Sequence, residues 1–70
     1  MNKALIAYLD ELINREKGFY SIEEVQKIDQ LNDSNSLALK EYLHDIIYMP
    51  HRVMITRAKI EKIKELYTNA

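Results

Sequence analysis

The sequence contains no cysteine, no tryptophan and only two histidines, His44 and His51. Without cysteine, disulfides and thiolate zinc sites are excluded, and two histidines are too few for a histidine-based structural zinc. A chain of 70 residues forms one domain at most, and a core of this size gains only about 3–5 kcal/mol net. Because disulfides and metal are excluded, we expect oligomerisation, or unusually good packing, to support residues 1–70 as a single helical domain.

Glycine and proline each occur once, at Gly18 and Pro50. Sheets need tight turns and helices do not, so this composition favours helices. No apolar run approaches the roughly 20 residues that cross a bilayer, and the N-terminus lacks a uniformly apolar signal segment. We therefore expect a cytoplasmic protein that does not bind membranes, and the start at Met1 suggests a complete gene product.

Apolar spacing predicts a first helix over residues 3–17, followed by Gly18 as the left-handed residue that ends it. A second helix is predicted over 22–31, because Ser21 and Glu24 have the spacing of a capping box. Tyr20 and Val25 are placed to form the hydrophobic staple across that cap.

The polar turn Asn32–Ser36 predicts the start of a third helix, capped by Asp33, Ser34 or Ser36 and ending near Tyr48. Two alternatives remain for the fourth helix. It begins at Pro50, or residues 51–55 are extended and Thr56 caps a shorter helix; we favour a start between Pro50 and Thr56.

The predicted fold class is therefore all-α, a small bundle of three to four short amphipathic helices. Its predicted core is apolar and drawn from all four helices: Leu5, Leu9, Leu12, Val25, Ile28, Leu39, Leu43, Ile46, Ile60 and Ile63.

Catalytic or metal-binding residues are not predicted. The best local group is Glu41, His44 and Asp45, but a single Glu-x-x-His spacing lacks the second copy found in carboxylate-bridged metal bundles. These three residues are expected on the polar side of the third helix. We predict no enzyme activity, no metal and no cofactor.

Charge is distributed unevenly along the chain. Residues 1–35 carry four basic and seven acidic side chains, whereas residues 36–70 carry six basic and four acidic ones. Basic side chains border the apolar stripe of the fourth helix and are candidate contacts for an anionic partner: Arg57, Lys59, Lys62 and Lys64. An acidic amphipathic helix is a suitable partner, and the acidic half of this chain, within one molecule or across a dimer, is one.

Five residues around the break after the third helix form the predicted partner-binding site: Tyr48, Met49, Arg52, Met54 and Ile55. Tyrosine, methionine and arginine are enriched at the centres of protein interfaces. One helical face cannot bury all the apolar residues of this segment, so we expect some of them to be exposed or covered by a partner.

The function predicted from sequence is a non-enzymatic protein–protein interaction module, a small adaptor, inhibitor or regulatory protein that occupies a partner's surface as a homodimer. The alternative is a DNA-binding transcriptional regulator with a helix-turn-helix-like segment at 21–48 and a basic segment at 52–64. Glu41 and Asp45, beside Lys40 and His44, disfavour the alternative because carboxylates repel phosphates.

Overall fold

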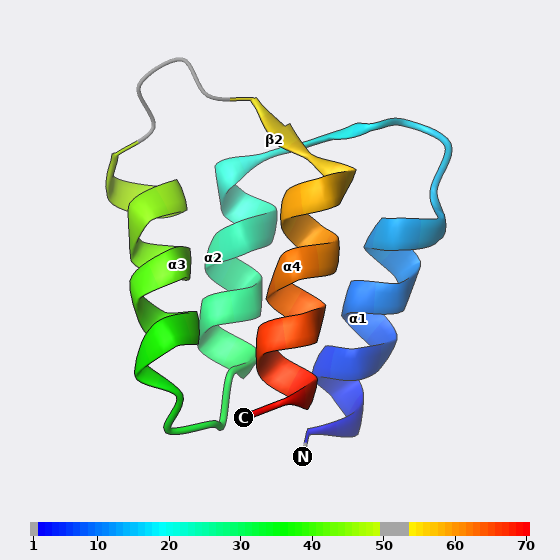
Figure 1. Cartoon of the computed structure of the whole chain (residues 1–70). Coiled ribbons are helices and arrows are strands. Elements are labelled where there is room, and N and C mark those ends of the chain that lie inside the picture. Colours follow the sequence, from blue (N-terminus) through cyan, green and yellow to red (C-terminus); the bar gives the residue numbers. More distant parts are fainter. Residues whose placement is uncertain (1, 50–53) are drawn as a thin grey trace.

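The computed structural model describes residues 2–49 and 54–70, and within them the chain forms a four-helix bundle with one short ribbon. The elements are α1 (Lys3–Asn14), β1 (Phe19–Tyr20), α2 (Ile22–Leu31), α3 (Leu37–Tyr48), β2 (Ile55–Thr56) and α4 (Arg57–Thr68). Successive helices run in alternating directions and α4 returns beside α1, so the ribbon lies at one end of the bundle and both termini at the other (Figure 1). The predicted all-α fold class is confirmed.

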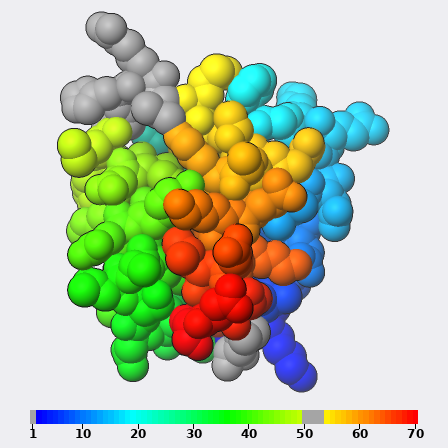
Figure 2. Space-filling model, in the orientation of Figure 1, coloured from blue at the N-terminus to red at the C-terminus, as the bar shows by residue number. Residues whose placement is uncertain are grey.

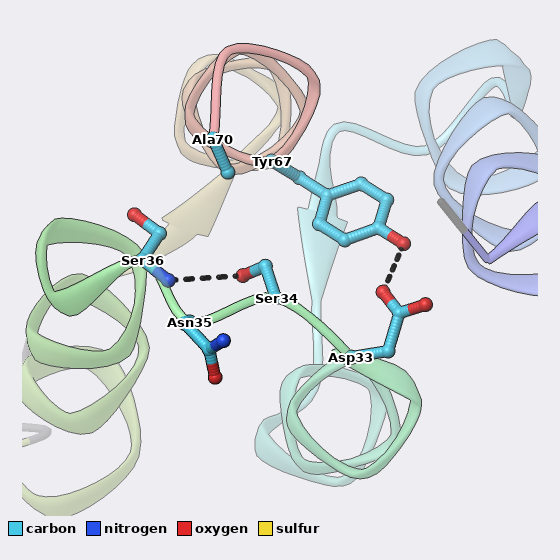
Figure 3. A pocket seen from close by; sticks show the side chains of 6 residues that line it. All are labelled: Asp33, Ser34, Asn35, Ser36, Tyr67 and Ala70. Atoms are coloured by element: carbon cyan, nitrogen blue, oxygen red, sulfur yellow. Dashed lines mark hydrogen bonds between the residues drawn. The ribbon is translucent and has the colours of Figure 1, made fainter.

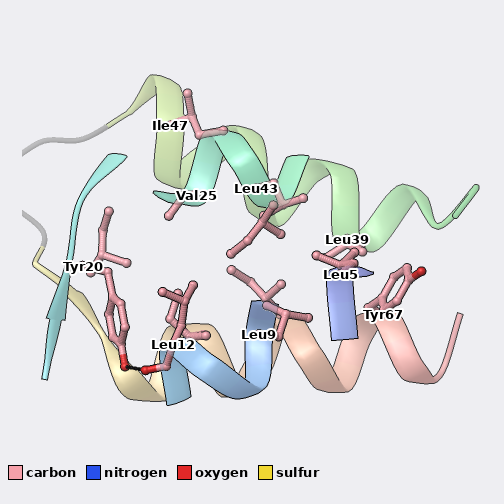
Figure 4. Packing of buried hydrophobic residues seen from close by; sticks show 13 residues of the cluster. Leu5, Leu9, Leu12, Tyr20, Val25, Leu39, Leu43, Ile47 and Tyr67 are labelled. Carbon is pink, nitrogen blue, oxygen red and sulfur yellow. Dashed lines mark hydrogen bonds between the residues drawn. The ribbon is translucent and has the colours of Figure 1, made fainter. Parts of the chain in front are cut away.

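The core is one continuous apolar cluster that receives side chains from every helix and from both strands (Figure 4). All of the predicted core residues except Ile46 are buried. The prediction for Ile46 is wrong in detail, because α3 buries the face that carries Leu39, Leu43 and Ile47, leaving Ile46 partly buried at its margin. The positions of Leu39 and Leu43 do not determine whether Ile46 or Ile47 faces the core, since both isoleucines lie about one turn beyond Leu43.

The predicted end of α1 is also wrong, because the helix stops at Asn14 rather than near Lys17. Arg15 is extended, and its guanidinium binds both carboxylate oxygens of Glu24, at 2.6 and 2.9 Å, and the carbonyl oxygen of Phe19. Gly18 therefore does not follow the helix directly, and its backbone is not left-handed. A long-range ion pair thus replaces the glycine cap expected from local sequence.

Arg57, the first residue of α4, binds the carbonyl groups at the end of α1. Its Nε donates to Ile13 at 2.9 Å and one of its terminal nitrogens donates to Arg15 at 2.6 Å. The last carbonyls of a helix have no partner within it, and a cation there also offsets the helix dipole. Arg57 therefore caps a helix that ends more than 40 residues earlier in sequence.

The caps at the starts of α2 and α3, formed by residues close in sequence, agree with the prediction. Ser21 and Glu24 form the capping box at the start of α2, and Tyr20 and Val25 are both buried beneath it. Of the three candidate caps for α3, Ser36 is the one used, because its hydroxyl accepts the amide of Leu39 at 3.2 Å. Both helices therefore start where the sequence predicts.

The ribbon at the upper end of Figure 1 was not predicted. Tyr20 pairs with Ile55 and Phe19 with Thr56 in antiparallel register. Of the two alternatives for the fourth helix, the continuous helix from Pro50 is therefore wrong for residues 54–56, and an extended segment before a shorter helix is confirmed there. α4 begins at Arg57 with Thr56 in the cap position, but Thr56 makes no side-chain capping bond. Residues 50–53, for which the two alternatives also differ, lie outside the described residues.

Candidate protein-binding surface

Three of the predicted contact residues are exposed apolar side chains where α3 ends and β2 begins. Tyr48 exposes 67% of its surface, Met49 60% and Met54 57%. They lie at the ribbon end of the bundle, on the two segments that flank residues 50–53 (Figure 1), and are called here the exposed cluster. Arg52, predicted to join them, lies outside the described residues.

Ile55 does not belong to this surface, which corrects the sequence-based prediction. Its side chain is 7% exposed and packs in the core opposite Tyr20. Successive side chains along an extended segment point to opposite faces, so when Ile55 enters the core Met54 is directed to solvent. No local pattern in the sequence indicates which of these two side chains is buried.

The four basic residues predicted to contact an anionic partner do not form one free patch. Arg57 is engaged by the carbonyls of α1, and Lys64 makes an ion pair with Asp10 of α1 at 2.5 Å. Lys62 lies 5.0 Å from the centre of the Tyr42 ring, and Lys59 is half-buried. Arg57 and Lys64 therefore bind the N-terminal half of the same molecule. The Lys64–Asp10 pair is the intramolecular form of the acidic partner expected from the sequence, and contact of these residues with an external partner remains a prediction.

The solvent side of α3 carries a second surface feature, with an apolar residue at each end and polar residues between them. At about 100° per residue, Leu37, Glu41, His44 and Tyr48 fall within an arc of about 60°. All four are exposed, and Leu37 exposes 67% of its surface. The rings of His44 and Tyr48 lie 4.8 Å apart at an angle of 54°. We call this line of four side chains the outer stripe of α3; the helix forms the left edge of the molecule in Figure 2.

Glu41, His44 and Asp45 are exposed on this side of α3, as expected. Among residues 2–49 and 54–70, no three His, Asp or Glu side chains are grouped so that they could hold a metal ion. Lys40 lies on one flank of the outer stripe and Asp45 on the other, so the surface offers charges of both signs.

A hollow of about 590 Å³ lies between the α2–α3 loop and the end of α4 (Figure 3). Two of the side chains that line it, Asp33 and Tyr67, are ionisable, and they bind each other at 2.5 Å. This bond lowers the pKa of Asp33, while burial and the bond to Asp33 raise the pKa of the Tyr67 hydroxyl. Both shifts move the pKa away from neutral pH, where a general acid or base works best. The hydrogen bond between Asp33 and Tyr67 links the α2–α3 loop to α4.

The same Tyr67 hydroxyl accepts the amide of Asn2 at 2.6 Å, and the Asn2 side chain donates to the carbonyl of Leu31 at 2.9 Å. Asn2 also caps α1 by accepting the amide of Ala4. These bonds join α1, α2 and α4 at the terminal end of the bundle, so the polar groups there serve packing.

Comparison with known proteins gives no relative: no family model, no curated protein and no solved structure matches the chain. Within the described part of the chain, every helix is too short or too polar to cross a bilayer.

The segment predicted to resemble a helix-turn-helix forms two helices, but α2 and α3 lie side by side in opposite directions (Figure 1). In a DNA-binding helix-turn-helix the two helices cross at about 90–120°, which lets the second enter the major groove while the first crosses the backbone. The arrangement of α2 and α3 therefore lends no support to the DNA-binding alternative.

Proposed function

We propose that this chain is a non-enzymatic protein-binding module of the cytoplasm, a small adaptor, inhibitor or regulator that presents its exposed cluster to a partner protein and associates with a second copy of itself. The observation that carries the proposal is that Tyr48, Met49 and Met54 each expose more than half of their surface beside a core that is already continuous.

Burial of a large apolar side chain stabilises a protein by about 1.5–3 kcal/mol. Side chains that stay exposed beside a complete core can gain this free energy when a partner covers them. Single exposed apolar residues are common, whereas several gathered at one end of a small protein mark a site of interaction. Tyrosine and methionine suit this role, since the first combines a rigid ring with a hydroxyl and the second adapts its shape to a partner.

The charge distribution supports a protein partner better than a nucleic acid. Two of the basic residues of α4, Arg57 and Lys64, already bind oxygen atoms of the same molecule. Lys40 on α3 is accompanied by Glu41 and Asp45, and the net charge of the chain is −1. A surface without excess positive charge gains little from the release of counterions that drives binding to phosphates.

The proposal is tested by affinity capture from the native host with three immobilised proteins: the wild type, the double variant Tyr48→Ser/Met54→Ser, and Phe19→Ser. Phe19 is the matched control, because it exposes 57% of its surface on the other strand of the ribbon. We expect the wild type and Phe19→Ser to retain the same protein and the double variant to lose at least nine-tenths of it. Equal capture by all three would contradict the proposal, as would a captured species that is nucleic acid.

A further inference from the structure

We propose that the outer stripe of α3 is a two-fold interface, in which α3 of one copy lies parallel to α3 of a second copy. This inference rests on the proposed function and names the partner and the geometry for one of its surfaces. The stripe residues Leu37, Glu41, His44 and Tyr48 are separated by four, three and four positions. This is the alternating spacing of the seam positions of a coiled coil, with apolar side chains at the two ends of the stripe and Glu41 and His44 between them.

The flanks of the stripe decide the direction. Lys40 and Asp45 lie on opposite sides of it, and they are five positions apart. In a parallel pair, each residue on one flank faces the residue five positions further on the opposite flank of the partner helix. Lys40 of one copy therefore faces Asp45 of the other, and the symmetry forms this ion pair twice.

An antiparallel pair would place like charges together. A two-fold axis perpendicular to the helices keeps each flank on its own side, so Lys40 would face the basic flank of the second copy and Asp45 the acidic one. Like charges brought together across an interface weaken association. On the flanks of the stripe, the charges are thus complementary only in the parallel arrangement. At the centre of the stripe, that arrangement brings the two Glu41 side chains together near the axis, where Lys40 of each copy lies beside them.

The surface of α3 has the shape that this packing needs. A shallow hollow of about 340 Å³ lies on its solvent side, lined by Leu37, Lys40, Glu41, His44 and Asp45. Four residues at the spacing of Leu37, Lys40, Glu41 and His44 are the ones that surround a side chain inserted from a facing parallel helix. The inserted side chain is Glu41 of the second copy, whose carboxylate then lies beside Lys40.

Parallel packing also joins the stripe to the exposed cluster. Tyr48 is the last residue of the stripe and the first of the cluster, followed directly by Met49. With the helices parallel, the Tyr48 rings of the two copies meet near the symmetry axis, and both clusters lie at the same end. Leu37 forms the apolar layer at the other end, so an apolar layer lies on each side of the charged centre.

The ion pairs are tested by sedimentation velocity over a range of concentrations with wild type, Lys40→Asp and Asp45→Lys. We expect a wild-type dimer, at least tenfold weaker association for either single variant, and recovery when the two variants are mixed, because only the mixed pair restores both contacts. Lys3→Asp, an exposed charge reversal on α1, is the control and should associate as the wild type does.

The direction is tested by oxidation of single-cysteine variants, since the chain has no cysteine of its own. Parallel helices bring Leu37→Cys beside its own copy, and likewise Tyr48→Cys, so each variant alone should give a covalent dimer. Covalent dimers only in a mixture of the two variants would show antiparallel packing and overturn the proposal. A wild type that stays monomeric, or an association that the charge reversals do not weaken, would overturn it too. Such a result would leave the proposed capture of a different protein through the exposed cluster unaffected. Each proposal can therefore fail without the other.

Discussion

Nε of Arg57 donates to the carbonyl oxygen of Ile13 at 2.9 Å, although 44 residues of sequence separate the two. The contact fastens the beginning of α4 to the end of α1, and the side chain also reaches the carbonyl of Arg15. We predict that Arg57→Ala lowers the free energy of unfolding by about 1.5–3 kcal/mol, the usual range for hydrogen bonds from a charged group. Urea unfolding followed by circular dichroism measures it. Arg57→Lys should recover only part of the loss, because its single nitrogen cannot reproduce the two separate nitrogen donors that bind Ile13 and Arg15. A fully stable alanine variant would contradict the capping role.

Tyr67→Phe tests the polar network at the terminal end of the bundle. The Tyr67 hydroxyl accepts the amide of Asn2 at 2.6 Å and donates to Asp33 at 2.5 Å. Its removal should lower the free energy of unfolding by about 1–3 kcal/mol, because the Asn2 amide loses its partner in a partly buried site. Thermal unfolding of Tyr67→Phe beside Tyr48→Phe, whose ring is exposed, checks this prediction. Equal effects of the two substitutions would show that the network adds nothing.

Acid should destabilise the protein through Glu24. The hydrogen bond from Arg15 holds the pKa of Glu24 below its ordinary value of 4.5. Between the folded and the unfolded pKa the unfolded chain binds more protons, so stability rises with pH there. The contribution is thus fully present above pH 4.5 and is lost as the pH falls through the lowered pKa. Urea midpoints from pH 6 to pH 2 should fall less steeply for Glu24→Gln than for the wild type, and identical slopes would refute the assignment.

Two leucines separated by one residue on α3 should behave in opposite ways. Leu39 is fully buried, whereas Leu37 exposes 67% of its surface. Leu39→Ala should cost about 2–5 kcal/mol of unfolding free energy, as for other buried leucines. Leu37→Ala should change it by less than about 0.5 kcal/mol when measured at a concentration where the protein is monomeric. Chemical denaturation of both variants checks the assignment, and a large loss in Leu37→Ala would place that residue in the core.

Features that depend on neighbouring residues could be predicted from the sequence. The capping box of Ser21 and Glu24 and the cap at Ser36 involve groups within three positions of one another, so spacing alone fixes where α2 and α3 begin. The apolar period likewise identified most of the core, because a helix buries residues that recur every three or four positions.

Features that depend on distant contacts could not be predicted. The end of α1 is set by Arg15 reaching Glu24 and by Arg57, and none of these partners is defined until the helices have packed. The burial of Ile55 rather than Met54 depends on Tyr20 lying opposite it. The choice between Ile46 and Ile47 depends on a small rotation of α3 about its axis. For the surface, the sequence predicted that some apolar residues around the break after α3 would be exposed, as Tyr48, Met49 and Met54 are. It left open whether the basic residues of α4 bind the acidic half within the molecule or across a dimer.

The central claim is that the exposed cluster is not needed for folding and is available for binding. The most direct measurement is the free energy of unfolding of Tyr48→Ser/Met54→Ser, obtained by urea titration at a concentration where the wild type is monomeric. We predict a value within about 0.5 kcal/mol of the wild type, with unchanged helicity, as for surface substitutions in general. A loss of more than about 2 kcal/mol, or a collapse of helicity, would show that these side chains belong to the core and would contradict the account.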